Sequence, residues 1–312
     1  MIEESRELFK AMGCPCEIRL LHQDKQLAET VLAECLAEVR RFEQKYSRYL
    51  YESVVSEINR SSGRGPITVD EETLGLLNYA GVCYEQSDGL FDVTSGVFRE
   101  IWHQGITRLP TGAQLGRCLE RVGWDKVALG KDSIELKVTG AQIDLGGLVK
   151  EYVVDALMEL LRQRGIEHGL INLGGDIGVV GPQADGSAWP IGVVNPFKSE
   201  QPIALIRISR GTISTSGSYE RFFEVDGTRF SHLINPKTGW PVEGLMSVSV
   251  VAPQAVVSGS MSSIALLHTE PEALALLSKS GAGHLAVCKD GEIKGTFAES
   301  TKGNESPHSG SF

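Results

Sequence analysis

Side chains that can do chemistry gather between Gly211 and Gly239, in a segment that holds a histidine, arginines and a run of hydroxyls. The imidazole of His232 titrates near neutral pH, which suits a group that accepts or donates a proton. Thr215 and Ser216 supply hydroxyls earlier in the same segment. These residue types predict a polar site.

The segment also carries a turn signal. Alternating apolar and polar residues on both sides of Asp226 and Gly227 predict a β-hairpin. Its first strand would be residues 212–219, and residues 230–234 would return from the turn with His232 at a strand end. A surface hairpin with incidental polar residues is the alternative interpretation.

A candidate phosphate-binding turn occupies residues 144–150, which read Asp-Leu-Gly-Gly-Leu-Val-Lys. A strand would end at Asp144, and a helix would begin after the two glycines with Lys150 in its first turn. Such a turn lets the backbone approach a diphosphate, and the helix N-terminus and the lysine both favour an anion. A tight strand-to-helix turn without a ligand is the alternative.

Two further motifs are ambiguous on their own. Residues 172–176 read Asn-Leu-Gly-Gly-Asp, and Asp176 would bind a metal or a ribose hydroxyl, or cap a turn. Tyr49 and Tyr51 would stack on a planar ring or pack at the edge of a core. The sequence leaves both choices open.

The elements that position these residues mix helices and strands without regular alternation, which predicts an α+β fold. Apolar residues at helical spacing from Ala28 to Tyr46 predict an amphipathic helix. Asp70 would cap a second helix that runs to about Ser87, and Thr269 opens a late helix with a capping box. A hairpin is expected over residues 9–21 with its turn at 13–15, and strands near 126–129, 133–138, 142–145, 169–173, 203–209, 245–252 and 284–288.

Composition excludes some classes of partner. The chain has 312 residues and a formal net charge of −10, which disfavours nucleic acid because phosphate backbones need a basic face. No window is apolar enough to span a bilayer, and the start shows no signal peptide. Six cysteines without paired metal spacing are typical of reduced, mostly buried thiols, so we expect a cytoplasmic protein. Residues 1–298 would form one large domain or two closely packed ones, and the polar residues 299–312 a disordered tail.

Taken in order, these motifs resemble the ApbE family of flavin transferases, from Ala11 to about Leu277. The segments that carry the resemblance are Met12, residues 47–49 with Ser53 and Asn59, residues 88–94, residues 144–150 with Tyr152 and Asp155, and residues 172–176, 215–221 and 231–239. The resemblance implies a two-lobed fold related to T-folds, with FAD in the cleft between the lobes. It also implies an activity, in which FMN is transferred from FAD to a Thr or Ser hydroxyl of an acceptor protein and AMP is released, with Mg2+ as cofactor.

The resemblance assigns site residues as well. His232 would lie near the reacting phosphate as the base, and Gly147 would offer its carbonyl to the metal. The FAD-binding set that it implies is Met12, Tyr49, Leu90, Phe91, Asp92, Asp144, Lys150, Thr215, Ser216 and His232.

The chain departs from the family at two places. The aspartate of the family's C-terminal metal motif is Gly259 here, and its threonine is Ser263. The family's Lys-Gly-Tyr has become Lys-Glu-Tyr, which introduces Glu151. Three hypotheses follow: Glu151 or Asp176 replaces the lost metal ligand, or the protein binds FAD without metal-dependent transfer, or it takes another ligand. An FAD pyrophosphatase that keeps the metal chemistry without a protein acceptor is a further alternative.

Overall fold

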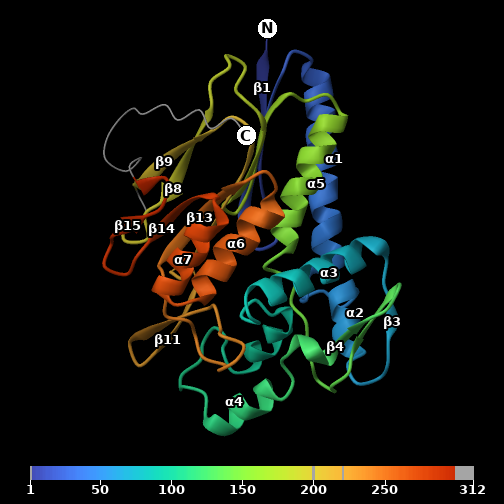
Figure 1. The fold of residues 1–312 in the computed structure, drawn as a ribbon. Coiled ribbons are helices and arrows are strands. Elements are labelled where there is room, and N and C mark those ends of the chain that lie inside the picture. The colour runs from blue at the N-terminus through green and yellow to red at the C-terminus, as the bar shows by residue number, and fades with distance from the viewer. Residues whose placement is uncertain (1, 199–200, 220, 299–312) are drawn as a thin grey trace.

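The computed structural model describes residues 2–198, 201–219 and 221–298 and is built on a large antiparallel sheet. The tail predicted to be disordered, residues 299–312, lies outside these residues. The sheet has eight strands in the order β1-β2-β6-β7-β10-β13-β14-β15 (Figure 1). Their bounds are β1 Glu3–Ala11, β2 Cys14–His22, β6 His168–Leu173, β7 Asp176–Gly181, β10 Gly211–Gly217, β13 Ser247–Ala252, β14 Gly283–Val287 and β15 Ile293–Lys294.

The two faces of this sheet have different covers. Ile171 and Val180 belong to the core beneath the helices, whereas their neighbours Leu170 and Val179 pack against Trp189 in a second cluster. This is the alternation that a pleated strand imposes. The helices are α1 (Lys25–Tyr46), α5 (Val149–Gln163), α6 (Ala255–Leu267) and α7 (Glu270–Ser280), and the second cover is the hairpin of β8 (Trp189–Val194) and β9 (Pro202–Ile208). Figure 1 shows α1 and α5 side by side along the sheet.

The remaining elements form a smaller assembly below the sheet in Figure 1. One apolar core runs through both parts, since Phe42 of α1, Leu157 of α5 and Leu76 of α3 belong to the same cluster. The smaller elements are α2 (Val54–Arg60), α3 (Glu71–Gln86), the short helices η1 (Val93–Glu100) and η2 (Trp124–Lys126), α4 (Gly112–Leu119), the strands β3 (Ile67–Thr68), β4 (Val127–Leu129) and β5 (Ser133–Leu136), and the hairpin of β11 (Phe222–Val225) and β12 (Thr228–Ser231).

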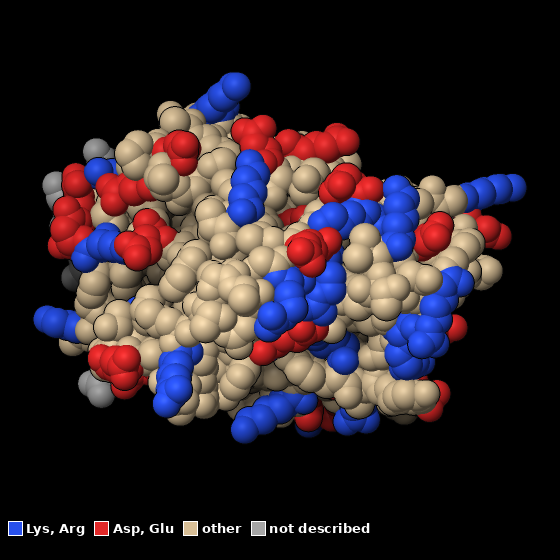
Figure 2. All heavy atoms as spheres, turned by 90° about the horizontal axis from the view of Figure 1, so that it is seen from below, with Lys and Arg blue, Asp and Glu red and all other residues tan. Residues whose placement is uncertain are grey.

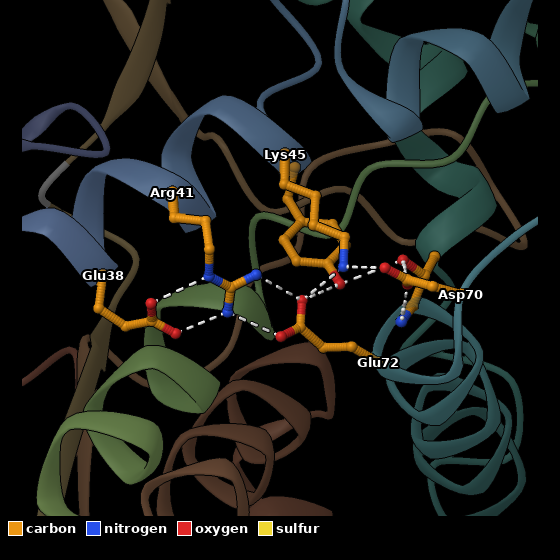
Figure 3. Close-up of polar contacts among 7 residues, drawn as sticks. Glu38, Arg41, Lys45, Asp70 and Glu72 are labelled. Atoms are coloured by element: carbon orange, nitrogen blue, oxygen red, sulfur yellow. Dashed lines mark hydrogen bonds and ion pairs between the residues drawn. The ribbon is translucent and has the colours of Figure 1, made fainter. Parts of the chain in front are cut away.

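A charged network fixes α1 against the start of α3 (Figure 3). The Arg41 guanidinium donates to both Glu38, at 2.6 Å, and Glu72, at 2.7 Å. The Lys45 ammonium bridges Glu72, at 2.7 Å, and Asp70. These contacts hold the pKa of Glu72 at about 2, because Arg41, Lys45 and the Tyr46 hydroxyl outweigh the burial that would raise it. The network therefore contributes to how the two parts of the chain are held together.

Most predicted elements are confirmed, as is the α+β class. Asp70 caps α3, and Thr269 with Glu272 forms the capping box of α7. The hairpin of residues 9–21 exists, but its turn is Met12–Gly13, both with positive φ, instead of residues 13–15. Residues 142–145 are not a strand.

The predicted hairpin around Asp226 and Gly227 is wrong in its first strand. The strand that pairs with β12 is β11, whereas residues 212–217 form β10 and pair with β7 and β13 in the large sheet. Thr215 and Ser216 therefore lie in the sheet, and His232 follows a separate small hairpin. Within the described residues, no helix combines the length and the apolar character needed to cross a membrane.

Candidate functional site

A buried ion pair joins the first turn of α5 to the start of β7. The Lys150 Nζ lies 2.6 Å from Oδ2 of Asp176, whose side chain is 5% exposed. Burial would lower the pKa of Lys150, but Asp176 and Glu151 reverse this and raise it above its ordinary value. Lys150 is therefore a fixed cation at the N-terminus of a helix, where an anion is favoured.

The glycine turn that precedes α5 is held by Asp144. Its Oδ1 accepts from the Gly146 amide at 2.9 Å, and its Oδ2 lies 3.0 Å from Arg48 and 3.2 Å from Arg99. Burial opposes the charged carboxylate, yet the two arginines outweigh it and hold the pKa of Asp144 below its usual range. Asp144 thus fixes the turn and two cations at once.

The N-terminus of α5 is open. Leu148 stands at the cap position without a side-chain hydrogen bond to the helix, and Gly146 and Gly147 are exposed. A Cβ on Gly147 would come within 3.6 Å of the Phe91 ring, which underlies the turn. The exposed glycines leave this helix end open to a diphosphate, although the Leu148 and Val149 amides themselves donate to the Leu145 carbonyl.

Hydroxyls connect β10 to α6 and β13. The Ser216 Oγ lies 2.8 Å from Ser262 Oγ and 3.0 Å from Ser263 Oγ. Thr215 Oγ1 lies 2.8 Å from Ser249 Oγ on β13. The structure therefore brings together Ser216 and Ser263, two residues that the sequence assigned to FAD and to the metal respectively.

Glu151 and Gly259 meet between α5 and α6. A Cβ added to Gly259 would lie 2.3 Å from Glu151 Cγ and 2.8 Å from its Oε1, so the glutamate occupies the space that a side chain at 259 would take. Glu151 is 4% exposed, and its Oε2 has no hydrogen-bond partner among the residues that the structure describes. Burial, with the charge of Asp176, raises the pKa of Glu151 to about 8. With that pKa the group is mostly protonated at neutral pH in the free protein, and a hard divalent cation, which prefers carboxylate oxygens, would bind it by displacing the proton.

His232 is held as a neutral imidazole. Its Nδ1 lies 2.9 Å from the Arg221 carbonyl oxygen, which can only accept, so Nδ1 carries the proton and Nε2 keeps its lone pair. Burial lowers the pKa of His232 to about 4, and the charges of Arg221, Arg99 and Lys150 contribute in the same direction. The imidazole is therefore in the form that accepts a proton at neutral pH.

Other predicted FAD residues lie in differing surroundings. Tyr49 is 74% exposed and its hydroxyl accepts from Arg99. Met12 is in the β1–β2 turn, where its amide donates to Glu43 at 2.6 Å. Leu90 is half-buried. Asp92 is buried and caps η1, accepting from the Thr94 amide at 2.8 Å, which gives it a structural task within the chain.

Three cations of this site were not among the predicted site residues. Arg48 and Arg221 lay inside motifs that were singled out, but neither was assigned a role; Arg99 carried no local signal. Arg48 and Arg99 reach Asp144 from segments distant in sequence, and the charge of Arg221 helps to lower the pKa of the nearby His232. Elsewhere charges of both signs are interspersed, as the face in Figure 2 shows.

Comparisons with known proteins give one consistent result. A model of the ApbE family matches residues 12–288. An FAD:protein FMN transferase of Klebsiella pneumoniae is 32% identical, over 77% of this chain and 75% of the relative, and one of Salmonella typhimurium is 27% identical, over 91% and 84%. The crystal structure of an ApbE protein from Thermotoga maritima superposes with a TM-score of 0.87 at 28% identity, covering 94% of this chain and 97% of that one. The flavin transferase ApbE from Vibrio cholerae, at 23% identity and a TM-score of 0.83, shares the fold over 97% and 99%.

Proposed function

Because the chain belongs to the ApbE family, we propose that it is an FAD:protein FMN transferase, which moves FMN from FAD to a Thr or Ser hydroxyl of an acceptor flavoprotein and releases AMP. The observation that carries the proposal in this chain is the first turn of α5, where Lys150 is a fixed cation beside the buried carboxyl of Glu151, with His232 near enough for the charge of Lys150 to help lower its pKa. Positive charge, a cation ligand and a neutral base are the three things that attack on a diphosphate requires.

The diphosphate of FAD would lie against the N-terminus of α5. Its negative charge is matched by Lys150 and by the positive end of the α5 dipole, which the exposed Gly146 and Gly147 leave accessible. Arg99 and Arg221 lie close enough to His232 to shift its pKa, so they add to the same positive field. The flavin would extend toward Met12, Tyr49 and Leu90, whose side chains supply apolar and aromatic surface, while the buried Phe91 would support the glycine turn beneath it.

We assign the divalent cation, Mg2+ in this proposal, to the Glu151 carboxylate, the Ser263 hydroxyl and the Gly147 carbonyl. Glu151 is favoured over Asp176 because Asp176 is already paired with Lys150, whereas Oε2 of Glu151 has no partner. When bound, such a cation neutralises charge on the diphosphate oxygens as the phosphorus is attacked. Ser216 would keep the Ser263 hydroxyl in position through the 3.0 Å contact between them.

His232 would serve as the base of the transfer. Its Nε2 takes the proton of the acceptor hydroxyl, whose oxygen forms a bond to the phosphorus of the FMN half of FAD. The bond from that phosphorus to the bridging oxygen breaks, and the oxygen leaves with AMP. Lys150 and the α5 N-terminus stabilise the negative charge that builds up on the phosphate oxygens.

The test combines the purified protein with FAD, MgCl2 and a threonine-containing acceptor domain. We expect the acceptor to gain the mass of FMN while AMP appears in equal amount. AMP and free FMN without a change in the acceptor would indicate an FAD pyrophosphatase. Bound FAD that stays intact, with no AMP released and no change in the acceptor mass, would indicate an FAD-binding protein and would overturn the transfer.

A further inference from the structure

Two cysteine thiols lie side by side at the start of β2. Cys14 and Cys16 are two residues apart on an extended strand, so their side chains share one face. Their sulfur atoms are 3.8 Å apart. Cys14 is partly exposed, whereas Cys16 and the other four cysteines are buried.

This pair supports the turn that positions the ion pair of the site. The Gly174 amide donates to the Pro15 carbonyl at 3.1 Å. Cys14 Sγ lies against Gly174 so closely that a Cβ there would come within 2.6 Å of it. The turn continues into Asp176, the partner of Lys150. A change in the geometry of Cys14 would therefore reach the proposed diphosphate site through two residues.

The two thiols have unequal reactivity. A hydrogen bond from the Cys16 thiol, with help from the charges of Lys150 and Arg221, lowers the pKa of Cys14 to about 7 against the opposing effect of burial. The same contact and burial raise the pKa of Cys16. A partly exposed thiolate beside a protonated thiol is the arrangement of an attacking and a resolving cysteine. Burial instead raises the pKa of Cys35 to about 12 and of Cys83 to about 11.

We propose that Cys14 and Cys16 form a reversible thiol–disulfide pair that responds to peroxide. The Cys14 thiolate attacks one peroxide oxygen, the O–O bond breaks, and the leaving hydroxide takes up a proton, which gives a sulfenic acid and water. The Cys16 sulfur then attacks the Cys14 sulfur, and the S–O bond breaks with loss of a second water. A small dithiol reduces the disulfide and restores both thiols.

Closing the bridge strains the strand. Residues two apart on an extended strand have Cα atoms about 6.6 Å apart, near the upper limit of what a disulfide spans. A shift toward the more usual separation of about 5.5–6 Å would shorten the backbone at Pro15 and draw its carbonyl away from Gly174. Resting on the proposed function, we infer that the oxidised form binds FAD more weakly, and that the strained bridge is easily reduced.

The chemistry is tested by peptide mapping of the native protein after hydrogen peroxide and then alkylation. We expect the peptide with Cys14 and Cys16 to be unalkylated and lighter by two hydrogens, and Cys35, Cys83 and Cys118 to be alkylated after unfolding. In Cys16→Ser, dimedone should trap a sulfenic acid on Cys14. Alkylation of both thiols after peroxide, or a sulfinic acid on Cys14 with Cys16 still reduced, would overturn the pair.

The consequence is tested by FAD titration of reduced, oxidised and re-reduced protein. We expect the dissociation constant to rise several-fold on oxidation and to recover with dithiothreitol, and peroxide to have no effect on a Cys14→Ser/Cys16→Ser variant. Equal affinities of the reduced and oxidised forms would refute the regulation. If the reduced protein binds no FAD, the proposed function fails, while the peptide map still decides the dithiol chemistry.

Discussion

The Glu151 side chain occupies the space that a side chain at position 259 would need. Its Cγ lies 2.3 Å from a Cβ built on Gly259. The two positions exclude each other sterically, so a carboxylate can enter this space from α5 or from α6 but not from both. We therefore propose that the two departures from the family motifs are one linked change, in which the acid enters from α5 in place of α6.

This linkage predicts the outcome of exchanging the residues. Glu151→Gly should weaken Mn2+ or Mg2+ binding by roughly tenfold or more, because the only acidic ligand is lost. Gly259→Asp alone should destabilise the fold through crowding. The double variant Glu151→Gly/Gly259→Asp should recover cation binding, since the acid then enters from α6. Calorimetric titration and the Mn2+ EPR signal measure this without turnover.

Glu159→Gly is the matched control for these variants. It lies on the same helix with its side chain 57% exposed, so it carries the same helix-propensity cost of about 1 kcal/mol without touching the site. Unchanged cation affinity in Glu151→Gly, or no recovery in a folded double variant, would rule out the exchange.

The lowered pKa of His232 predicts an unusual pH dependence of the transfer reaction. Since burial lowers its pKa to about 4, the free protein keeps a neutral base well below the range of an ordinary histidine. Protonation of His232 should therefore not lower kcat/KM until the pH falls toward 4. His232→Ala should reduce transfer by roughly 10²–10⁴-fold. An acidic limb that persists unchanged in His232→Ala would contradict the assignment.

Lys150 should contribute to FAD binding. We expect Lys150→Gln to raise the dissociation constant of FAD about tenfold, or ~1.4 kcal/mol, because a charged contact to the diphosphate is replaced by a neutral one. Flavin fluorescence quenching measures it. Lys279→Gln, an exposed residue of the last turn of α7, is the control and should bind FAD as wild type does.

The network in Figure 3 predicts acid sensitivity of the fold. The pKa of Glu72 is lowered from 4.5 to about 2, so its ion pairs stabilise the folded state above pH 4.5 and are lost as the pH falls toward 2. Allowing for solvent screening, the contribution is about 1 kcal/mol. Glu72→Gln should lower the free energy of unfolding at pH 7 and flatten its fall below pH 4.5. Urea unfolding at several pH values measures both, and parallel curves would contradict the prediction.

Sequence patterns predicted the elements that depend on residues close together in the chain. The caps at Asp70 and Thr269 and the apolar stripe of α1 each depend on residues within a few turns, and all three are confirmed. Strand pairing is different, because β10 bonds to β7 and β13, which are distant in sequence. The alternation of residues 212–219 predicts a strand but does not determine which strand it pairs with. The prediction that it pairs with the strand after Gly227 was wrong.

The site residues also divide into those predicted from short motifs and those that depend on contacts between distant segments. The sequence named Lys150 and His232 because their motifs are contiguous. It could not choose between Glu151 and Asp176 as the missing acid, since both follow small motifs with glycines. The choice rests on contacts across the fold: Asp176 is paired with Lys150, and Glu151 faces Gly259 with one oxygen unpartnered.

The single apolar core that joins α1, α3 and α5 has a consequence for how FAD enters and leaves. A hinge between the two parts would have to expose Phe42 and Leu76 and separate Arg41 from Glu72. Such a motion costs far more than rearranging an exposed loop. Ligand exchange should therefore proceed by movement of the exposed segment around Tyr49, with a rigid scaffold behind it, and viscosity or crowding should affect it less than in enzymes that open and close by domains.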